Sequence, residues 1–208
     1  VDEANGRTFL LQGITGSGKT EVYLRAAAKA VEHGKQVLML VPEIALTAQL
    51  VKRFKAWFGD MVAVAHSKLS QNERGDVWYK MHTHQANILI GVRSAVFAPF
   101  KNLGLIIIDE EHESSYKQEE RPNYHARAVA LQRSRYTGAP LILGSATPDL
   151  ESYYKATNGE YEHLRLTKRA TGSLLPTVEI MDMRKELQER NFSVLSRKLK
   201  QALVTTAS

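Results

Sequence analysis

The sequence predicts an α/β domain with a doubly wound, mostly parallel sheet that carries helices on both faces. Short runs of apolar residues bounded by turns alternate with amphipathic helical stretches, and this alternation is typical of parallel α/β domains. The runs at 37–41 (VLMLV) and 105–108 (LIII) are continuous in apolar residues, as in strands that helices cover on both faces. In such a fold the loops at the carboxyl ends of the strands form the binding site.

Each element is predicted by a local signal. The first helix is expected at 21–33, where Gly34 can close it. The stretch 45–58 has apolar residues at spacings of three and four, which predicts a helix. The expected strands are 9–11, 37–41, 61–65, 88–90, 105–108 and 141–143, and the expected helices are 21–33, 45–58 and 72–84.

The pattern changes after about residue 150. Residues 161–166 and 176–181 (PTVEIM) are predicted to be strands of a connecting region, and 193–203 an amphipathic helix with no following strand beside it. We therefore expect residues 1–167 to form one domain. Residues 168–208 are expected to be a linker and the opening of a second domain that this chain lacks.

Composition narrows the class of protein. Of 208 residues, 43% are hydrophobic and 24% charged, which is typical of a soluble globular protein. No apolar stretch is long enough for a membrane helix, no secretory signal is visible, and the absence of cysteine argues against disulfides and structural zinc in this segment. The net charge of +6 favours a polyanionic partner such as nucleic acid, although a basic enzyme surface would give the same value.

A glycine-rich segment at 13–20 (GITGSGKT) matches the phosphate-loop pattern in full and lies between a predicted strand and a predicted helix. Backbone N–H groups of such a loop surround phosphate oxygens. Lys19 is expected to reach the β- and γ-phosphates of ATP and Thr20 to bind Mg²⁺. The alternative is a glycine-rich turn that binds nothing. The predicted nucleotide-binding residues are Gly13, Thr15, Gly16, Ser17, Gly18, Lys19 and Thr20.

An acidic motif follows the apolar run at 105–108. Asp109 is expected to contact Mg²⁺, through water, and Glu110 to orient and deprotonate the attacking water. Clustered carboxylates beside a phosphate are costly without a metal, so Mg²⁺ is part of the prediction. The alternative is an exposed acidic turn. We expect the two motifs to lie on neighbouring strand ends and to hold one metal-bound triphosphate.

Five motifs together resemble a known family. Residues 13–20, 42–47 (PEIALT), 91–95 (GVRSA), 109–112 (DEEH) and 144–148 (GSATP) are similar, in order and spacing, to the first RecA-like lobe of superfamily 2 helicases. Additional runs such as SSYKQE are similar to bacterial replication-restart helicases of the DEEH-box type. The resemblance covers about residues 8–200. It implies a RecA-like P-loop NTPase lobe at 1–167, which binds ATP, and the start of a truncated second RecA-like lobe within 168–208.

The resemblance also implies residue roles. Lys19, Asp109, Glu110 and His112 would be catalytic, with His112 linking the acidic motif to the motif that couples hydrolysis to DNA movement. That coupling motif holds Ser145 and Thr147, although the 144–148 turn could be only a strand exit. The predicted DNA-binding residues are Thr47, Arg93, Ser94, Tyr116, Lys117, Arg121 and Tyr124. Thr47 could instead be a helix N-terminal residue. The aromatic segment, residues 114–127, could be a polar surface loop with Tyr124 packed down.

The implied activity is that of an ATP-dependent 3′-to-5′ DNA helicase of replication restart in the bacterial cytoplasm. Its partners would be forked and single-stranded DNA, primosome proteins and single-strand-binding proteins, without a membrane. ATP and Mg²⁺ are the implied cofactors, and zinc belongs to a region this chain lacks. Arginines of the second lobe complete the site in this family, so we expect the chain alone to hydrolyse little ATP. The alternatives are a DNA translocase without strand separation and an ATP-switched DNA-binding module.

Overall fold

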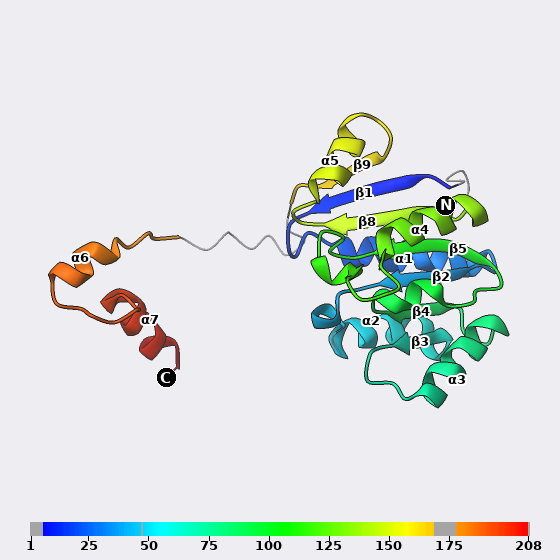
Figure 1. Cartoon of the computed structure of the whole chain (residues 1–208), viewed down its shortest axis with the longest axis horizontal. Coiled ribbons are helices and arrows are strands. Elements are labelled where there is room, and N and C mark those ends of the chain that lie inside the picture. The colour runs from blue at the N-terminus through cyan, green and yellow to red at the C-terminus, as the bar shows by residue number, and fades with distance from the viewer. Residues whose placement is uncertain (1–5, 47, 169–177, 208) are drawn as a thin grey trace. The chain divides into compact units, whose positions relative to one another are not determined.

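The computed structural model describes residues 6–46, 48–168 and 178–207. The chain divides into two compact units, Val1–Gly172 and Ser173–Ser208. The first unit is built on a seven-stranded sheet in the order β3-β4-β2-β5-β8-β1-β9, in which every neighbouring pair is parallel (Figure 1). The strands are β1 (Thr8–Gly13), β2 (Gln36–Leu40), β3 (Val62–Ala65), β4 (Ile88–Gly91), β5 (Leu103–Ile108), β8 (Leu141–Ser145) and β9 (Glu162–Leu166).

Helices cover both faces of this sheet, which confirms the predicted doubly wound α/β class. Beside the helices lies a two-stranded antiparallel pair, β6 (Lys117–Gln118) with β7 (Tyr124–His125). The α-helices of this unit are α1 (Lys19–Glu32), α2 (Ala48–Phe58), α3 (Gln71–His82), α4 (Ala126–Thr137) and α5 (Leu150–Thr157). Four short 3₁₀ helices join them: η1 (Glu43–Ala45), η2 (Gly59–Met61), η3 (Arg93–Phe97) and η4 (Ser114–Tyr116).

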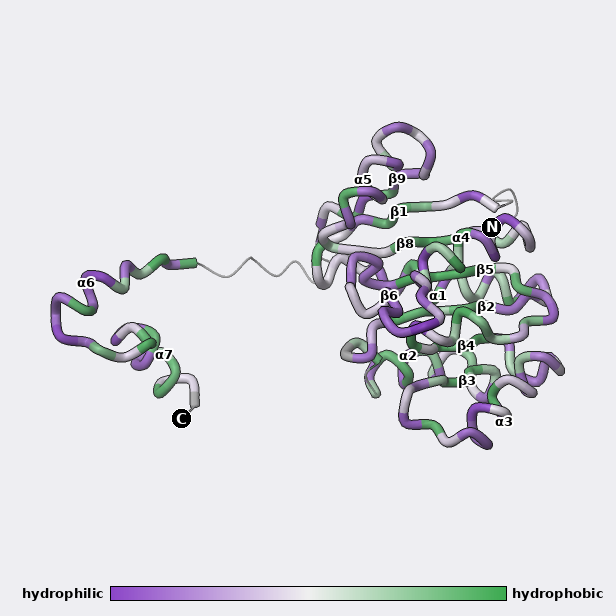
Figure 2. Tube along the Cα trace, in the orientation of Figure 1, coloured by the Kyte–Doolittle hydropathy of each residue, from purple (hydrophilic) through white to green (hydrophobic). Residues whose placement is uncertain are grey.

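The core consists of two hydrophobic clusters, one on each face of the sheet. Along β2, Leu38 and Leu40 belong to the cluster under α3, α4 and α5, while Val37 and Met39 belong to the cluster under α1 and α2. Successive side chains of a strand point to opposite faces, so a continuous apolar run supplies both clusters. Hydrophobic residues gather along inner strands of the sheet such as β4 and β5 (Figure 2). Burying each such side chain contributes about 1.5–3 kcal/mol.

The region after residue 150 differs from the prediction. Residues 161–166 are not part of a connecting region, because β9 pairs in parallel with β1 and forms an edge of the main sheet.

The expected helix at 45–58 is divided into η1 and α2, and residue 47 between them lies outside the described residues. The first helix begins at Lys19, ahead of the predicted 21, directly after the glycine loop.

The second unit contains α6 (Met183–Gln188) and α7 (Arg197–Ala207). The strand predicted at 176–181 is wrong where it can be tested, since 178–181 form no strand; 176 and 177 lie outside the described residues. The predicted helix at 193–203 begins later, at Arg197. Its expected first residues form turns closed by side chains, because the Asn191 and Ser193 side chains accept hydrogen bonds from the backbone N–H groups of Ser193 and Leu195.

Candidate nucleotide site and DNA-facing surface

The phosphate-loop segment joins the end of β1 to the start of α1. Gly16 and Gly18 have φ values of 79° and 98°, which place both in the left-handed region that glycine adopts readily. Gly18 caps α1 without any side-chain hydrogen bond, so the first N–H groups of the helix are not occupied by a capping side chain. A helix N-terminus of this kind attracts anions. The loop geometry therefore fits a phosphate group.

Two buried polar groups lie inside the loop. Lys19 is only 9% exposed, and its Nζ donates a hydrogen bond to the Gly13 carbonyl at 2.8 Å. The Ser17 hydroxyl is buried and has no hydrogen-bond partner among the described residues. A buried hydroxyl without a partner costs free energy, which a phosphate oxygen bound in the loop would recover. The residues present thus fit the predicted nucleotide phosphates.

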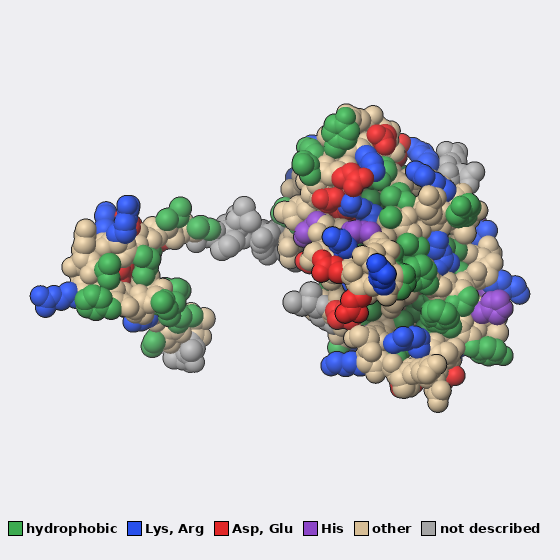
Figure 3. All heavy atoms as spheres, in the orientation of Figure 1, with side chains coloured by type: hydrophobic (Ala, Val, Ile, Leu, Met, Phe, Trp, Pro, Cys, Tyr) green, Lys and Arg blue, Asp and Glu red, His purple; other side chains and the backbone are tan. Residues whose placement is uncertain are grey.

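The acidic motif meets this loop. The Lys19 Nζ lies 3.6 Å from Glu110 Oε1, and the Tyr23 hydroxyl on α1 donates to Asp109 Oδ1 at 2.9 Å. The predicted meeting of the phosphate loop and the acidic pair is therefore present, although their strands are not neighbours, since β8 lies between β1 and β5. Figure 3 shows acidic and histidine side chains gathered on the side of the molecule where β1 and β8 end in Figure 1.

Burial raises the pKa of the Asp109 carboxyl above its ordinary value, while the Tyr23 hydrogen bond and the Lys19 charge oppose that rise. Burial also raises the pKa of Tyr23, so its hydroxyl remains a hydrogen-bond donor. No group of three or more His, Asp or Glu residues among the described parts of the chain forms a metal cage. A magnesium ion in a phosphate-loop site needs few protein ligands, because phosphates and waters supply the others. Thr20 and Asp109 fit that pattern.

Glu110 has an unusual backbone conformation. Its φ of 45° is in the left-handed region, which is strained for a residue with a side chain. The turn directs its carboxylate between two groups, since Oε1 faces Lys19 and Oε2 lies 3.7 Å from His112 Nδ1. Backbone strain of this kind is often found at functional sites.

His112 connects the acidic motif to the end of β8. Its Nδ1 lies 2.8 Å from the Ser145 hydroxyl, and its Nε2 lies 3.5 Å from the Thr147 hydroxyl. Ser145 is fully buried and also accepts a hydrogen bond from the Thr147 N–H, while Thr147 is exposed. The structure therefore brings His112 and the two predicted coupling residues into one hydrogen-bonded group.

A buried ion-pair network behind the acidic motif was not predicted from the sequence. Glu111, 1% exposed, accepts hydrogen bonds from the Arg127 guanidinium at 2.6 Å, the Ser152 hydroxyl at 2.9 Å and the Asp149 N–H at 2.8 Å. Arg127 also contacts Asp149 and Glu151. The network ties β5 to the first turns of α4 and α5. An apolar run followed by acids does not indicate which acid is buried, so no sequence signal identified Glu111.

The predicted DNA-backbone residues lie on η3. Ser94 is exposed, and with Arg93 and Arg74 it lines a cavity of about 300 Å³ beside Pro42 and Glu43. The Arg93 guanidinium donates to the carbonyls of residues 115 and 117, which ties η3 to the aromatic segment. Thr47 lies outside the described residues.

The aromatic segment differs from the prediction at Tyr116. Its side chain is 1% exposed and its hydroxyl donates to the Asp109 carbonyl at 2.7 Å, so it cannot stack on a DNA base in this structure. Burial raises the pKa of Tyr116, which keeps this donor protonated. Lys117 and Arg121 are exposed, and Tyr124 is half-buried against Phe97. The prediction that Tyr116 contacts DNA is therefore wrong here.

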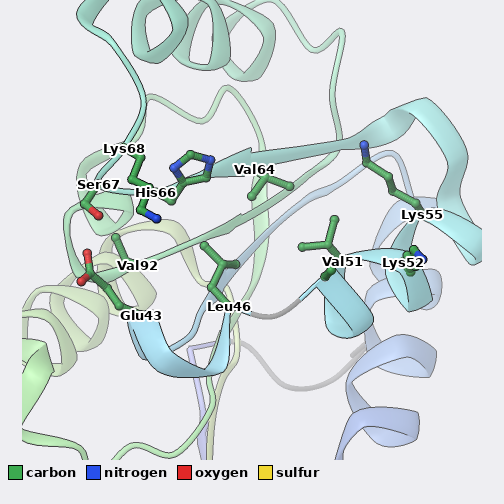
Figure 4. Close-up of a pocket in the computed structure, with 11 residues that line it drawn as sticks. Glu43, Leu46, Val51, Lys52, Lys55, Val64, His66, Ser67, Lys68 and Val92 are labelled. Carbon is green, nitrogen blue, oxygen red and sulfur yellow. The ribbon is translucent and has the colours of Figure 1, made fainter.

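A larger cavity of about 910 Å³ lies between η1, α2 and the end of β3 (Figure 4). Leu46, Val51 and Val64 line it with apolar side chains, while Lys52 and Lys68 stand toward its opposite ends. Lysines beside the 42–47 segment would attract a polyanion. The cavity thus adds positive charge to the surface on which the DNA-backbone residues were predicted.

A glycine-rich phosphate loop and an acidic strand end that meet on one parallel sheet define a P-loop nucleotide-binding protein. Residues 2–156 match the family model described as DEAD/DEAH box helicase, and the chain belongs to this family. Membership implies that the chain uses a nucleotide such as ATP, and it agrees with the RecA-like fold expected from the motifs.

The curated relatives point to a more specific group within this family. The chain is 52% identical to Replication restart protein PriA of Bacillus subtilis (strain 168) over 206 residues, which is 99% of this chain and 26% of that protein. It is 51% identical to the protein of the same name from Synechocystis over 199 residues, 93% of this chain and 24% of that protein. The predicted resemblance to replication-restart helicases is confirmed, and the chain spans about a quarter of the length of these relatives.

Solved structures give the same fold. A structure of RecG bound to a three-way DNA junction aligns with a TM-score of 0.58 and 25% identity, covering 91% of this chain and 25% of RecG. None of the described helices combines the length and the apolar composition that crossing a bilayer requires.

Proposed function

We propose that this chain is the ATP-binding motor lobe of a DNA helicase of replication restart. One observation carries the proposal: Lys19 of the phosphate loop lies 3.6 Å from Glu110, and Tyr23 of the following helix donates to Asp109, so the two motifs form one site. The identity to PriA proteins supports the role in replication restart. In this proposal the lobe acts in a 3′-to-5′ helicase of the bacterial cytoplasm.

The proposed chemistry assigns one task to each group of the site. Lys19 and the loop N–H groups would bind the β- and γ-phosphates. Thr20 and Asp109 would hold Mg²⁺, whose charge would offset that of the transferring phosphoryl group. Glu110 orients a water and accepts its proton. The Lys19 ammonium group lies between the Gly13 carbonyl and the Glu110 carboxylate. This position supports its proposed role of placing positive charge beside Glu110.

Coupling to DNA follows from the hydrogen-bonded group around His112. Glu110 and Ser145 both lie near its Nδ1, at 3.7 and 2.8 Å, while Thr147 lies 3.5 Å from its Nε2. A change at the nucleotide would therefore move the end of β8, and Arg93, Ser94, Lys117 and Arg121 would hold the DNA. RecG has been solved on a DNA junction, which supports forked DNA as the substrate class.

The domain assignment remains part of the proposal. Residues 1–167 form the first RecA-like lobe, and 168–208 form a linker and the start of a second lobe. Zinc, primosome proteins and single-strand-binding proteins belong to the longer protein in which such a lobe works. The arginines of a second lobe are worth about 10³–10⁵ in rate where measured. This chain alone therefore binds ATP weakly and hydrolyses it slowly.

Two measurements test the nucleotide site. Titration calorimetry of this chain with ATP and Mg²⁺ should give binding that Lys19→Ala abolishes and that Lys101→Ala, an exposed lysine before the amino end of β5, leaves unchanged. In a full-length helicase carrying this chain, Glu110→Gln should remove ATP turnover yet keep ATP binding. Glu119→Gln, an exposed carboxylate of the aromatic segment, is the matched control. Turnover retained in Glu110→Gln would remove Glu110 from its role.

The same full-length protein separates the other functions. Single-stranded DNA should stimulate its ATPase, whereas an ATP-switched binding module would show no stimulation. A forked duplex should be unwound, whereas a translocase would hydrolyse ATP without separating the strands.

A further inference from the structure

A second small cavity lies beside the proposed DNA-backbone surface. It encloses about 230 Å³ between the end of β3, α3 and η3, and its lining includes Ala65, His66, Arg74, Trp78, Ser94 and Phe97. This volume is below the roughly 300–1,000 Å³ of pockets for drug-sized molecules, so a single planar ring system is the size of group that it suits. No carboxylate lines this cavity.

Two large aromatic side chains on its walls are unusually exposed. Trp78 on α3 is 39% exposed and Phe97 at the end of η3 is 48% exposed. The Trp78 ring has no ring contact or hydrogen bond with any described residue. Phe97 is held in place by the Tyr124 ring, 4.9 Å away at an interplanar angle of 72°. The cavity therefore offers one free and one supported aromatic surface.

One histidine that lines the cavity has a polar atom without a partner. The Nδ1 atom of His66 is buried and makes no hydrogen bond within the described parts of the chain. His66 lines both this cavity and the larger cavity of about 910 Å³, and a buried polar atom without a partner is costly. Arg74 and Ser94 line both this cavity and the adjacent cavity of about 300 Å³ that contains Arg93. A ligand with its planar polar group in the small cavity could therefore place an attached anion in the neighbouring cavity of about 300 Å³.

We propose that the small cavity binds one unpaired nucleobase of a DNA strand whose phosphates pass Arg74 and Arg93. A nucleobase combines a π face, which stacks on aromatic side chains, with a hydrogen-bonding edge. Only an unpaired base can enter, because a base within a duplex is stacked between its neighbours. The inference rests on the proposed DNA binding and adds a base contact to it, which would favour single strands.

The chain has two tryptophans, so Trp57→Phe leaves Trp78 as the sole indole. This variant is titrated with an oligothymidylate and with an abasic strand of the same length, while anisotropy reports binding and fluorescence reports Trp78. The oligothymidylate should quench Trp78 and bind more tightly than the abasic strand. Trp78→Ala and Phe97→Ala should each weaken its binding by about 5- to 150-fold and remove the preference over the abasic strand.

Two further variants guard the interpretation. Tyr79→Ala removes an aromatic side chain that is 61% exposed on the same helix and does not line the cavity, so it should leave the affinity unchanged. Trp78→Phe keeps a stacking ring and should retain most of the affinity, which excludes misfolding as the cause of the losses. Equal binding of both strands with unquenched Trp78 would overturn the base pocket but leave DNA binding intact. Binding of neither strand would overturn the pocket and the proposed DNA binding together.

Discussion

Gly144 lies near the end of β8, directly against the side chain of Tyr23. A Cβ atom at Gly144 would lie 1.6 Å from the Tyr23 hydroxyl oxygen, so Tyr23 must move if any side chain is added there. Because that hydroxyl donates to Asp109, the displacement would also release the Asp109 carboxylate. The close approach at Gly144 therefore protects the geometry of the acidic motif.

We predict that Gly144→Ala lowers the free energy of unfolding by about 1–3 kcal/mol, the usual cost of overpacking a core. Thermal denaturation should show a melting temperature lower by about 2–4 °C per kcal/mol. The double variant Gly144→Ala/Tyr23→Phe should recover part of the loss, because it removes the atom of closest contact. Gly159→Ala is not a suitable control. Gly159 has a φ of 80°, so alanine there would be strained by its backbone conformation and not by overpacking. An unchanged melting temperature for Gly144→Ala would contradict the prediction.

At the scale of residues, the sequence predicted which charged residues form the site. It did not predict which neighbouring residues hold them in position. Lys19 and Glu110 could be placed together because strand ends of a parallel sheet meet at one edge. Tyr23 was not predicted because its hydrogen-bond partner Asp109 follows a distant strand. The Tyr23 side chain can reach Asp109 only because Gly144 has no side chain. Tyr116 was misplaced because an aromatic residue in a polar segment gives no indication of which way it points.

At the scale of elements, Arg127 holds three of them together. Its guanidinium joins Glu111 after β5 to Asp149 and Glu151 at the start of α5. Burial acts to lower the pKa of Arg127, but the contacts with Glu111 and Asp149 outweigh it and raise that pKa. Replacing it with Met would leave the Glu111 charge, 1% exposed, without a counter-ion. The turn that carries Thr147 depends on the same network, because the Asp149 N–H donates to Glu111.

We predict that Arg127→Met destabilises the chain by about 3–5 kcal/mol, the cost of breaking a buried ion pair from one side. Chemical denaturation would measure this loss, and adding Glu111→Gln should reduce it. Arg25→Met provides the matched control, since Arg25 forms an exposed pair with Glu21 on α1 worth about 0–1 kcal/mol. Similar losses in Arg127→Met and Arg25→Met would show that the network is not important for stability.

The start of α4 should respond to pH through His125. Its Nδ1 accepts a hydrogen bond from the Arg127 N–H, which only a neutral ring can do, and burial and the Arg127 charge lower the pKa of His125. A histidine whose pKa is lower in the folded state stabilises the fold above its unfolded pKa of about 6.5, and this contribution is lost as the pH falls through the folded pKa. Amide hydrogen exchange in the first turn of α4 should therefore speed up below about pH 6, after correction for the intrinsic rate.

The variant His125→Asn checks this interpretation. Asparagine is a good N-cap residue and does not titrate in this range, so the pH dependence of α4 protection should disappear while the protection itself remains. A pH dependence that persists in His125→Asn would assign the effect to another group.

Elements with a strong periodic pattern were predicted well. Element boundaries that depend on side-chain hydrogen bonds were not. The late start of α7 results from the Asn191 and Ser193 turns, whose hydrogen bonds compete with helix formation. Residues 161–166 were assigned to a connecting region because the pattern changes after about residue 150, yet they form β9 at an edge of the main sheet.

For the whole molecule, the fold class was predictable and the strand order was not. Alternating strands and helices determine a parallel sheet, but which strands are neighbours depends on packing between distant segments. The order matters for the site, because β8 lies between β1 and β5 and so brings Ser145 to His112.

The net charge of +6 favours DNA binding by the whole molecule, and the salt dependence of that binding reports the number of phosphate contacts. Each phosphate contact releases counter-ions, so the logarithm of the affinity for a single strand should fall linearly with the logarithm of salt concentration, with a slope of about −0.7 per contact. Lys117 is the residue of choice for the test, because it is exposed and its side chain forms no hydrogen bond or ion pair with any described residue. Arg93 is less suitable, because its guanidinium also binds the carbonyls of residues 115 and 117.

Lys117→Ala should therefore reduce the magnitude of the slope by about 0.7 and weaken binding equally for strands of different sequence. Anisotropy titrations of a labelled oligothymidylate across a range of NaCl concentrations measure both quantities. Lys101→Ala removes the same charge before the amino end of β5, at the opposite edge from the proposed surface, and should leave the slope unchanged. If the two variants changed the slope equally, binding would reflect the total charge of the chain, and the DNA path across η3 and the aromatic segment would have to be abandoned.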